Sequence, residues 1–487
     1  MRGRFASFVV GAGLMGLALI CAVFGFYATV LGEAAGGFGL AGGLSVALGA
    51  LLLWAGSLQA DPARREAIIG VLLLWLVVPL VGAIPYAVSG GLTPVSAAFE
   101  SMSGFTATGA TVLRDFETFP LSLFMYRALS QWLGGVGIIV LFVAVFPKLA
   151  IAGRQLFFAE MPGPTEEKLT PRLRNTAAAV LAVYLVMTVL AALAYIAAGM
   201  VPFDAVAHAL TTLAAGGFSP RGDSFAAYHS AAIDWIAVLF MTVAGISFTL
   251  QYQALMGRPR TLWRDPEFRA YGLILLGASA LLFYVLQGLY EPGEALRHAM
   301  FQAVSIMTTT GYASADFGAW PAQAQAVLLV LMFVGGSAGS AAGGVKVMRW
   351  LIIAKNTARE VNRALHPRAV MPVRVGERTI PEEVLRAVVA FLTLFLGLFT
   401  LITLVLIWLE ADFLTAISAA IACVGNVGPG LAGVGPMQHF DDLHATSRLV
   451  LTFAMYAGRL EVVTLFVVLN RRFWRLPRGS RATFDID

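Results

Sequence analysis

Long apolar runs recur along the whole chain, and short polar or glycine-rich segments separate them. Each run has about 20 residues or more, which lets an α-helix cross a hydrocarbon core of ~30 Å. The pattern predicts a helical hairpin and then four units, each with a long helix, a short helix with a loop, and a second long helix. The predicted long helices cover residues 5–32, 38–60, 67–90, 121–147, 174–200, 232–257, 270–290, 322–352, 383–410 and 447–470.

Four shorter apolar segments lie between the paired long helices. They cover residues 94–105, 203–214, 295–307 and 412–423. A helix of about 12 residues measures roughly 18 Å, or half of a membrane. We therefore expect ten full spans and four re-entrant segments. Thr93 and Pro94 suit the start of the first short helix, with threonine as the cap and proline in the first turn.

Each short segment is followed by a loop of small residues that contains glycine. The loops read Thr106-Ala107-Thr108-Gly109, Ala214-Ala215-Gly216-Gly217, Thr308-Thr309-Thr310-Gly311 and Asn426-Val427-Gly428. Irregular backbone at bilayer depth is tolerated only where it is buried in protein or lines a wet cavity. Four such strands around one axis would present rings of carbonyl oxygens that can replace a cation's hydration shell. Glycine lets the backbone turn and leaves the axis open. The candidate cation-filter residues are Ala107, Thr108, Gly109, Ala215, Gly216, Gly217, Thr309, Thr310, Gly311, Asn426, Val427 and Gly428.

The spacing of these loops indicates internal duplication. Their last glycines, Gly109, Gly217, Gly311 and Gly428, are 108, 94 and 117 residues apart. The predicted domains are an N-terminal transmembrane hairpin and four pore repeats, of which the third includes the glycine-rich segment 335–344 and the fourth a cytoplasmic C-terminus. They cover residues 1–62, 63–150, 151–262, 263–378 and 379–487.

Composition and charge agree with a multi-pass membrane protein. The chain of 487 residues is 59% hydrophobic and 13% charged, with a mean hydropathy of +0.80, and a soluble chain would need far more charge. A membrane β-barrel would show short alternating segments instead. In the predicted topology 27 of the 33 lysines and arginines fall on one side. That side is cytoplasmic by the positive-inside rule, so both termini are expected inside. The first apolar run is too long for a signal peptide, and we interpret it as a retained helix.

Other functional classes find little support in the sequence. Basic residues fall into short loops rather than one stripe, which argues against nucleic-acid binding. Cys21 and Cys423 lie in apolar stretches and predict neither a disulfide framework nor a zinc site. His439 and His444 flank two aspartates but have no further ligand at a recognised spacing. Residues 11–16 fit a dinucleotide pattern by letter, yet they lie in a predicted membrane helix. We expect this chain to bind no cofactor.

Seven short segments carry a family resemblance. They are residues 103–110, 131–137, 216–219, 308–312, 335–346, 428–430 and 458–461. Together these segments resemble the signatures of the TrkH/KtrB superfamily of potassium transporters. The resemblance covers about residues 67–470, and the additional N-terminal hairpin makes the chain more similar to the TrkH branch.

The resemblance implies an all-α polytopic membrane protein in which four M1–pore helix–M2 repeats surround a pore in a pseudo-fourfold arrangement. It also implies a homodimer in membrane lipid that takes up potassium across the bacterial inner membrane, with rubidium as a second candidate ion. A cytosolic nucleotide-binding ring of the TrkA type is the implied regulatory partner. The basic stretch 346–386 would suit docking to that ring, although topology alone explains its charge.

The loops depart from the superfamily pattern in two places. Ala214 and Ala215 stand where hydroxyl residues are usual, and the fourth loop has Asn426 and Val427. These changes matter little if backbone carbonyls coordinate the ion, but they argue against a ring of four threonine hydroxyls. In this superfamily, serine in place of the first filter glycine is associated with sodium permeation, so Gly109 favours potassium.

Residues 335–344 place many glycines in the middle of an apolar run. Each glycine costs ~1 kcal/mol against alanine in a helix, so a broken helix is predicted. Close packing of small residues between helices is the alternative, and the resemblance favours an intramembrane gate loop below the filter. The predicted gate residues are Gly335, Gly336, Gly339, Gly343, Gly344, Lys346 and Arg459.

Arg459 is the one basic residue placed deep inside a predicted span. A charge there is costly and normally faces a cavity or a partner. We expect Arg459 to repel or gate cations together with the 335–344 loop. A structural pair with Glu461 or another carboxylate is the alternative.

Two other functions stay open at this point. The first is a sodium or mixed-cation symporter of the same superfamily. The second is an integral-membrane enzyme, which would need a nucleophile–base pair or a metal cluster at membrane depth, and the sequence offers neither. Coupling to protons would favour carboxylates inside the spans, of which Glu461 is the main candidate.

Overall fold

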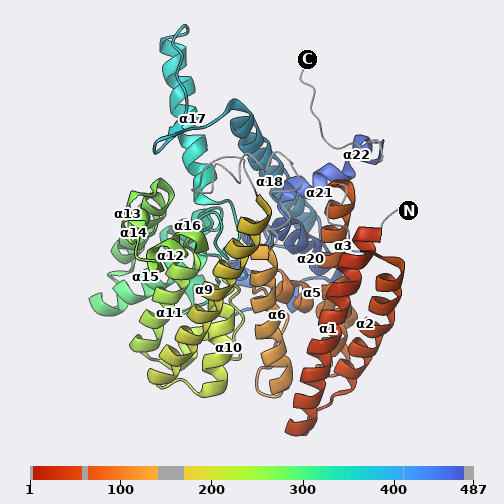
Figure 1. Cartoon of the computed structure of the whole chain (residues 1–487). Coiled ribbons are helices and arrows are strands. Elements are labelled where there is room, and N and C mark those ends of the chain that lie inside the picture. Colours follow the sequence, from red (N-terminus) through yellow and green to blue (C-terminus); the bar gives the residue numbers. More distant parts are fainter. Residues whose placement is uncertain (1–3, 58–63, 141–168, 410, 476–487) are drawn as a thin grey trace.

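The computed structural model describes residues 4–57, 64–140, 169–409 and 411–475. These residues form helices connected by loops, with two short antiparallel strands, β1 (Arg374–Val375) and β2 (Arg378–Thr379) (Figure 1). The longer helices are α1 (Arg4–Leu31), α2 (Gly36–Ala55), α3 (Arg64–Gly82), α6 (Leu121–Val140), α9 (Leu169–Ala197), α11 (Ala231–Ala244), α14 (Pro266–Leu286), α17 (Val347–Leu365), α18 (Glu382–Trp408) and α20 (Ala445–Arg459). The shorter ones are α4 (Ile84–Val88), α5 (Pro94–Phe105), α10 (Pro202–Leu213), α12 (Phe248–Leu255), α13 (Arg260–Arg264), α15 (Pro292–Met307), α16 (Ala322–Leu331), α19 (Phe413–Val424), α21 (Val462–Leu469) and α22 (Arg471–Arg475).

The predicted N-terminal hairpin is present as α1 and α2, which lie side by side at one edge of the molecule (Figure 1). The two helices approach closely where both carry glycine: a Cβ added to Gly11 would lie 3.0 Å from the carbonyl oxygen of Gly49. The hairpin is anchored to α6 by aromatic packing. The Phe38 ring lies 5.5 Å from that of Tyr126 and 5.9 Å from that of Phe24.

All four predicted short helices are present, as α5, α10, α15 and α19. Three of them have proline in their first turn, where its missing N–H costs nothing. The Thr93 side chain accepts a hydrogen bond from the Ser96 N–H, so the predicted start of α5 is confirmed. In α19 the cap is Asp412, which accepts from the N–H groups of Leu414 and Thr415.

Two long helices predicted as continuous are broken. The segment 232–257 divides into α11 and α12, with a bend of 102° between them. The segment 447–470 divides into α20 and α21, with a bend of 104°. At the first break, the Gln251 side chain donates to the carbonyl oxygens of Val243 and Ile246. These two carbonyl groups therefore have a hydrogen-bond donor although the helix is interrupted there. At the second, Glu461 has a φ of +57°, which an α-helix cannot accommodate. The apolar pattern continues through the first break, whereas Gly458, Arg459 and Glu461 interrupt it at the second, where a continuous helix is predicted.

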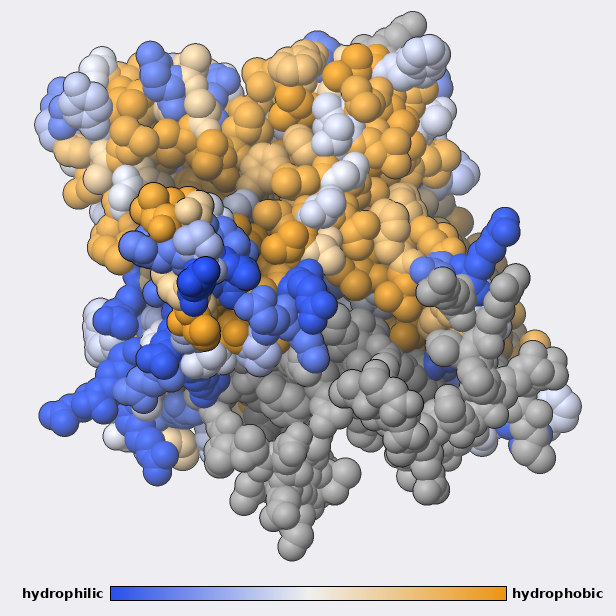
Figure 2. Space-filling model, turned by 90° about the horizontal axis from the view of Figure 1, so that it is seen from above, coloured by the Kyte–Doolittle hydropathy of each residue, from blue (hydrophilic) through white to orange (hydrophobic). Residues whose placement is uncertain are grey.

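The predicted break in 322–352 is confirmed: α16 ends at Leu331, and α17 begins at Val347 and continues to Leu365. The outer part of α17 projects from the body at the end where α22 lies (Figure 1). Seen from that end, hydrophilic residues gather on the left of the surface and hydrophobic residues cover its upper half (Figure 2).

Within the described residues, six helices are long and apolar enough to cross a membrane, or up to eight if each bent pair counts as one span. Large apolar side chains such as Phe26, Trp54 and Trp408 are exposed on three of these helices, as expected of surfaces that face lipid. The fold is therefore that of an all-helical, multi-pass membrane protein. The count of ten spans stays a prediction.

Candidate cation filter and gate

The four loops that follow the short helices share one backbone pattern. In each loop a residue other than glycine has a positive φ, and a glycine two positions later also has one. The first set is Ala107 (49°), Ala215 (51°), Thr309 (56°) and Asn426 (54°), and the second is Gly109 (86°), Gly217 (78°), Gly311 (81°) and Gly428 (100°). A positive φ is uncommon outside glycine. Its recurrence at the same position makes the loops conformational copies of one another.

The loops also contact one another in a closed cycle. A Cβ added to Gly109 would lie 2.2 Å from the carbonyl oxygen of Gly216 in the second loop. On Gly217 it would lie 1.9 Å from the oxygen of Thr310, and on Gly311 it would lie 2.1 Å from that of Val427. On Gly428 it would lie 2.6 Å from the oxygen of Thr108, which returns to the first loop. Each glycine thus abuts the carbonyl that precedes the glycine of the next loop, and the four loops form one ring.

One backbone N–H group of each loop donates a hydrogen bond within its own repeat. At the position before the ring glycine, the N–H donates to a carbonyl five residues earlier, at the end of the preceding short helix. These hydrogen bonds are Thr108 to Ser103 (2.9 Å), Gly216 to Thr211 (2.9 Å), Thr310 to Ser305 (2.9 Å) and Val427 to Ala422 (2.8 Å). The arrangement directs N–H groups towards the helices, whose C-terminal ends carry partial negative charge. Carbonyl oxygens at these positions are the groups suited to contact a cation.

Side-chain support of the ring differs between loops. The hydroxyls of Thr106 and Thr108 lie 2.7 Å apart in the first loop, and those of Thr308 and Thr310 lie 2.8 Å apart in the third. In the second loop, which lacks these hydroxyls, Gln131 of α6 supplies the contact: its Nε2 donates to the Gly216 oxygen at 2.5 Å.

The fourth loop is tied to the first by Asn426. Its Nδ2 donates to the Thr108 hydroxyl at 2.8 Å and to the Met455 carbonyl at 3.0 Å. Asparagine also tolerates the left-handed conformation better than most residues other than glycine. The second loop, which lacks the hydroxyls, is thus held by Gln131, and the fourth loop is held by Asn426.

A buried ion pair braces the ring on one side. Arg127 of α6 and Glu100 of α5 are almost fully buried, and their closest N–O distance is 2.7 Å. Arg127 also donates to the Ser219 carbonyl at 3.1 Å and lies 3.9 Å from the centre of the Phe218 ring, so it joins the first and second repeats. Glu100 in turn accepts from the Val112 N–H at 2.9 Å, directly after the first loop.

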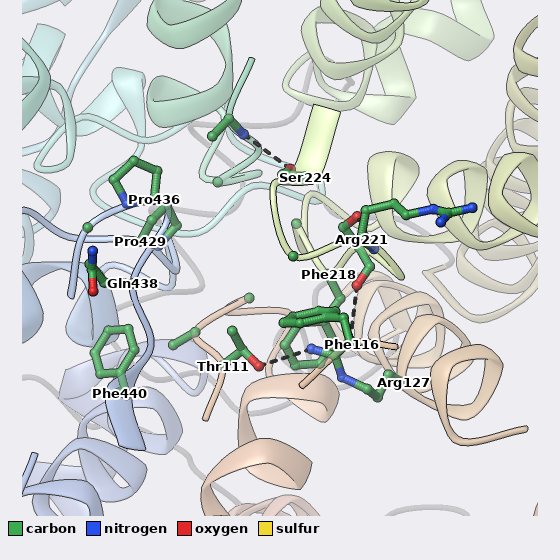
Figure 3. A pocket seen from close by; sticks show the side chains of 18 residues that line it. Thr111, Phe116, Arg127, Phe218, Arg221, Ser224, Pro429, Pro436, Gln438 and Phe440 are labelled. Atoms are coloured by element: carbon green, nitrogen blue, oxygen red, sulfur yellow. Dashed lines mark hydrogen bonds between the residues drawn. The ribbon is translucent and has the colours of Figure 1, made fainter. Parts of the chain in front are cut away.

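A cavity of about 50 Å³ lies on the Arg127 side of the ring (Figure 3). All four loops reach it, through Gly109, Gly217, Gly311 and Pro429. In Figure 3, Thr111 and Phe218 lie close to Arg127, while Pro429, Pro436 and Phe440 approach from the fourth repeat. The volume admits a few water molecules or a partly hydrated ion.

The predicted gate residues 335–344 form an irregular loop against the opposite side of the ring. Val334 and Val345 pair in a single parallel bridge, which brings the two ends of the loop together. The Gly343 N–H donates to the hydroxyl of Thr309, a predicted filter residue, at 2.6 Å. A Cβ added to Gly335 would lie 2.1 Å from the Gly343 oxygen, and one on Gly343 would lie 2.6 Å from the Gly425 oxygen. Glycine is required here for close backbone packing.

The remaining predicted gate glycines belong to the same loop. Gly339 and Gly344 have φ values of +72° and +66°, and a Cβ on Gly336 would lie 2.9 Å from the carbonyl oxygen of Gly245. The loop is held on its other face by Glu267 of α14. One oxygen of this carboxylate accepts from the N–H groups of Ala338 (2.8 Å) and Met348 (3.0 Å).

Both predicted basic gate residues are buried at this loop. Lys346 donates to the Ala342 carbonyl. Arg459, the last residue of α20, donates to the Ala341 carbonyl at 3.3 Å and to the Gly134 carbonyl of α6 at 3.2 Å. It therefore joins the gate loop to the first repeat. The alternative pairing of Arg459 with Glu461 is wrong, because Glu461 binds Arg349 at 2.8 Å.

A second cavity, of about 30 Å³, lies between the gate loop and the fourth repeat. It is lined by Gly343, Lys346, Asn426 and Arg459, among others. The structure thus brings together the predicted filter and gate residues, with a cavity on either side of the ring.

Sequence reasoning did not assign roles to Gln131, Arg127 or Glu267, whose partners are far away in the chain. It placed Glu100 among the carboxylates of the outer loops, which is wrong, because Glu100 is fully buried in α5. Gln131 is the first residue of 131–137, one of the seven segments that carry the family resemblance, and this was the available signal.

Fold and site together define a multi-pass helical membrane protein in which four similar loops form one ring beside a buried, glycine-rich loop. Residues 38–475 match the TrkH family, described as cation transport protein. A Trk system potassium uptake protein TrkH from Halomonas elongata is 40% identical over 445 residues, which cover 90% of this chain and 92% of the relative. One from Vibrio parahaemolyticus is 39% identical over 442 residues, which cover 87% and 91%.

A crystal structure of the potassium transporter TrkH from Vibrio parahaemolyticus superposes with a TM-score of 0.87 at 35% identity and covers 98% of this chain and 100% of that chain. This chain belongs to the TrkH family of cation transport proteins. It is a transporter and not an enzyme, so the hypothesis of a membrane enzyme is wrong.

Proposed function

We propose that this chain mediates potassium uptake across the bacterial inner membrane, through a selectivity filter of backbone carbonyls from the four loops. The observation that carries this proposal is the closed cycle in which each ring glycine abuts the carbonyl of the next loop. Such a ring can replace the hydration shell of a cation. The names of the similar proteins, potassium uptake proteins and a potassium transporter, support potassium as the ion.

The proposed pathway has the cavity beside Arg127 on the outside and the cavity beside Arg459 on the inside, as the distribution of lysine and arginine favours. Ten spans and four re-entrant segments, with both termini in the cytoplasm, belong to the same proposal. The filter consists of residues 107–109, 215–217, 309–311 and 426–428. Because the four repeats have the same orientation, they converge on an axis normal to the bilayer.

The proposed gate is the 335–344 loop with Lys346 and Arg459. Its support is the contact of Gly343 with Thr309 and the position of Arg459, which holds both the loop and α6. A buried positive charge below the filter opposes cation passage. We further propose a homodimer and control by a cytosolic nucleotide-binding ring of the TrkA type.

Ion flux from proteoliposomes tests the proposal. We expect potassium and rubidium gradients to drive flux that sodium and lithium gradients do not. Equal permeation by all four ions would overturn the selective filter. Uptake that requires a sodium gradient would favour the sodium or mixed-cation symporter instead.

A further inference from the structure

Gln131 of α6 is the side chain through which one repeat holds the filter loop of the next. It is fully buried. Its Nε2 donates to the Gly216 carbonyl at 2.5 Å, and its Oε1 accepts from the Phe218 N–H at 3.0 Å. The single amide group therefore spans the ring glycine Gly217 from both sides, which fixes the backbone of the second loop at the point where it meets the third.

Gln131 also fills the space of a missing side chain. The position before the ring glycine is Thr108 in the first loop and Thr310 in the third, but it is Gly216 in the second. A Cβ added to Gly216 would lie 2.5 Å from both Cδ and Oε1 of Gln131. A larger residue at 216 would displace the Gln131 amide from its present position. The amide from α6 therefore occupies the space in which the first and third loops carry a threonine side chain.

We infer that Gln131 is a specificity-determining residue, which orients the Gly216 carbonyl in the ring and holds the second loop at the same distance from the axis as the others. A carbonyl oxygen has two lone pairs, so it can accept from Gln131 and still face a cation. In the first and third loops two threonine hydroxyls within the loop bond to each other instead. The inference rests on the proposed function of the ring as a potassium filter.

Three substitutions separate the hydrogen bonds from the volume of the side chain. Gln131→Met keeps the length and removes both hydrogen bonds. Gln131→Glu keeps the shape, but as a carboxylate it places an oxygen against the Gly216 carbonyl and repels it. When the new carboxyl is protonated, its O–H can donate to the Gly216 oxygen while its C=O accepts from Phe218, so the neutral acid reproduces the amide. Gln325→Glu is the matched control, because Gln325 also donates to two carbonyls, those of Gly318 and Trp320, away from the ring.

The experiment measures the flux ratio of potassium to sodium in proteoliposomes of the full chain between about pH 5 and pH 8. We expect Gln131→Met to lower the ratio about tenfold at every pH, a change that corresponds to ~1.4 kcal/mol and lies within the worth of one hydrogen bond. We expect Gln131→Glu to lower it at high pH and to recover towards the wild-type ratio as the pH falls, because protonation restores the donor. Gln325→Glu should keep the wild-type ratio throughout.

The outcomes separate this inference from the function on which it rests. A wild-type chain that passes potassium and sodium equally would overturn the proposed filter itself. A selective wild-type chain together with an unchanged ratio in both Gln131 variants would overturn the role of Gln131 alone. A fall in Gln131→Glu with no recovery at low pH would also contradict it, because a purely structural defect does not depend on the protonation of that carboxyl.

Discussion

The side-chain amide of Asn426 donates to the hydroxyl of Thr108 at 2.8 Å, across 318 residues of sequence. The contact joins the last filter loop to the first, where the ring has to close. In a pore built from four identical subunits, the same contact would occur four times. Here a single chain provides four loops that differ in sequence. Each contact is therefore open to a separate test by substitution.

Because Asn426 ties the fourth loop to the first, we expect its substitution to change ion selectivity. Asn426→Gly removes the hydrogen bonds to Thr108 and Met455 but keeps a residue that accepts the left-handed conformation. Asn426→Ala removes the same bonds and adds strain of roughly 1–2 kcal/mol. We expect both variants to lose potassium over sodium selectivity, and the alanine variant to be the less stable. Wild-type selectivity in both would mean that closure of the ring does not depend on this contact.

Substitution of a ring glycine should cause a steric clash in addition to backbone strain. Gly109→Ser places a Cβ 2.2 Å from the Gly216 oxygen, so the loops must separate and selectivity against sodium should fall. Gly199 has a similar φ of +94°, but nothing lies within 4 Å of an added Cβ. Gly199→Ala should therefore cost ~1–3 kcal/mol of stability through strain alone and leave selectivity unchanged. Equal flux ratios for Gly109→Ser and the wild type would contradict the placement of the first filter loop.

Arg459 predicts a change in gating. Its substitution by alanine removes a buried positive charge and two hydrogen bonds, to Ala341 and Gly134. We expect Arg459→Ala to raise cation flux or to weaken control by the regulatory partner. Arg459→Lys keeps the charge but cannot reach both carbonyls with one planar group, so it separates repulsion from anchoring. Unchanged flux and unchanged regulation in liposomes would contradict a gating role.

The buried pair of Arg127 and Glu100 predicts a loss of stability. Arg127→Met leaves the Glu100 carboxylate unpaired in the interior, which should cost ~3–5 kcal/mol and lower the thermal unfolding midpoint in detergent. Combining it with Glu100→Gln should recover much of that loss. The exposed pair of Arg363 and Glu360, at 3.9 Å, is the control, since Arg363→Met should cost less than ~1 kcal/mol. Equal effects of Arg127→Met and Arg363→Met would contradict the brace.

We expect the contribution of Asp441 to the stability of the fold to depend on pH. Partial burial by itself would raise the pKa of this carboxyl, but hydrogen bonds from Arg114 and Ser96 and the charge of Arg448 outweigh it and hold the pKa below 3.8. A carboxyl with a lowered pKa stabilises the fold above its unfolded pKa, and this contribution disappears as the pH falls through the folded value. The unfolding midpoint of the wild type should therefore exceed that of Asp441→Asn near neutral pH, and the difference should shrink below about pH 4. A constant difference down to pH 3 would contradict this assignment.

Much of the fold was predictable because the signals are local. Apolar runs, the Thr93–Pro94 start and the glycines of residues 335–344 act on the backbone within a few residues, and the structure has the corresponding helices and break. The bend at Gly245 was missed because the apolar pattern continues through it, and the bend at Leu460 was missed although Arg459 and Glu461 interrupt the pattern there. They are stabilised by contacts such as that of Gln251 with the Val243 carbonyl, which the pattern does not encode.

The sequence by itself determined the class of protein, the four glycine-bearing loops and the candidate filter residues, since these follow from composition, spacing and short motifs. The candidate gate residues followed from the glycine-rich segment together with the family resemblance. Only the tertiary structure decided how the loops touch. It closed the ring from Gly428 to Thr108, assigned Glu461 to Arg349 rather than Arg459, and placed Gln131 against Gly216. The physical reason is that hydrogen bonds and steric contacts depend on distances of a few ångströms between residues that the chain separates by tens or hundreds of positions.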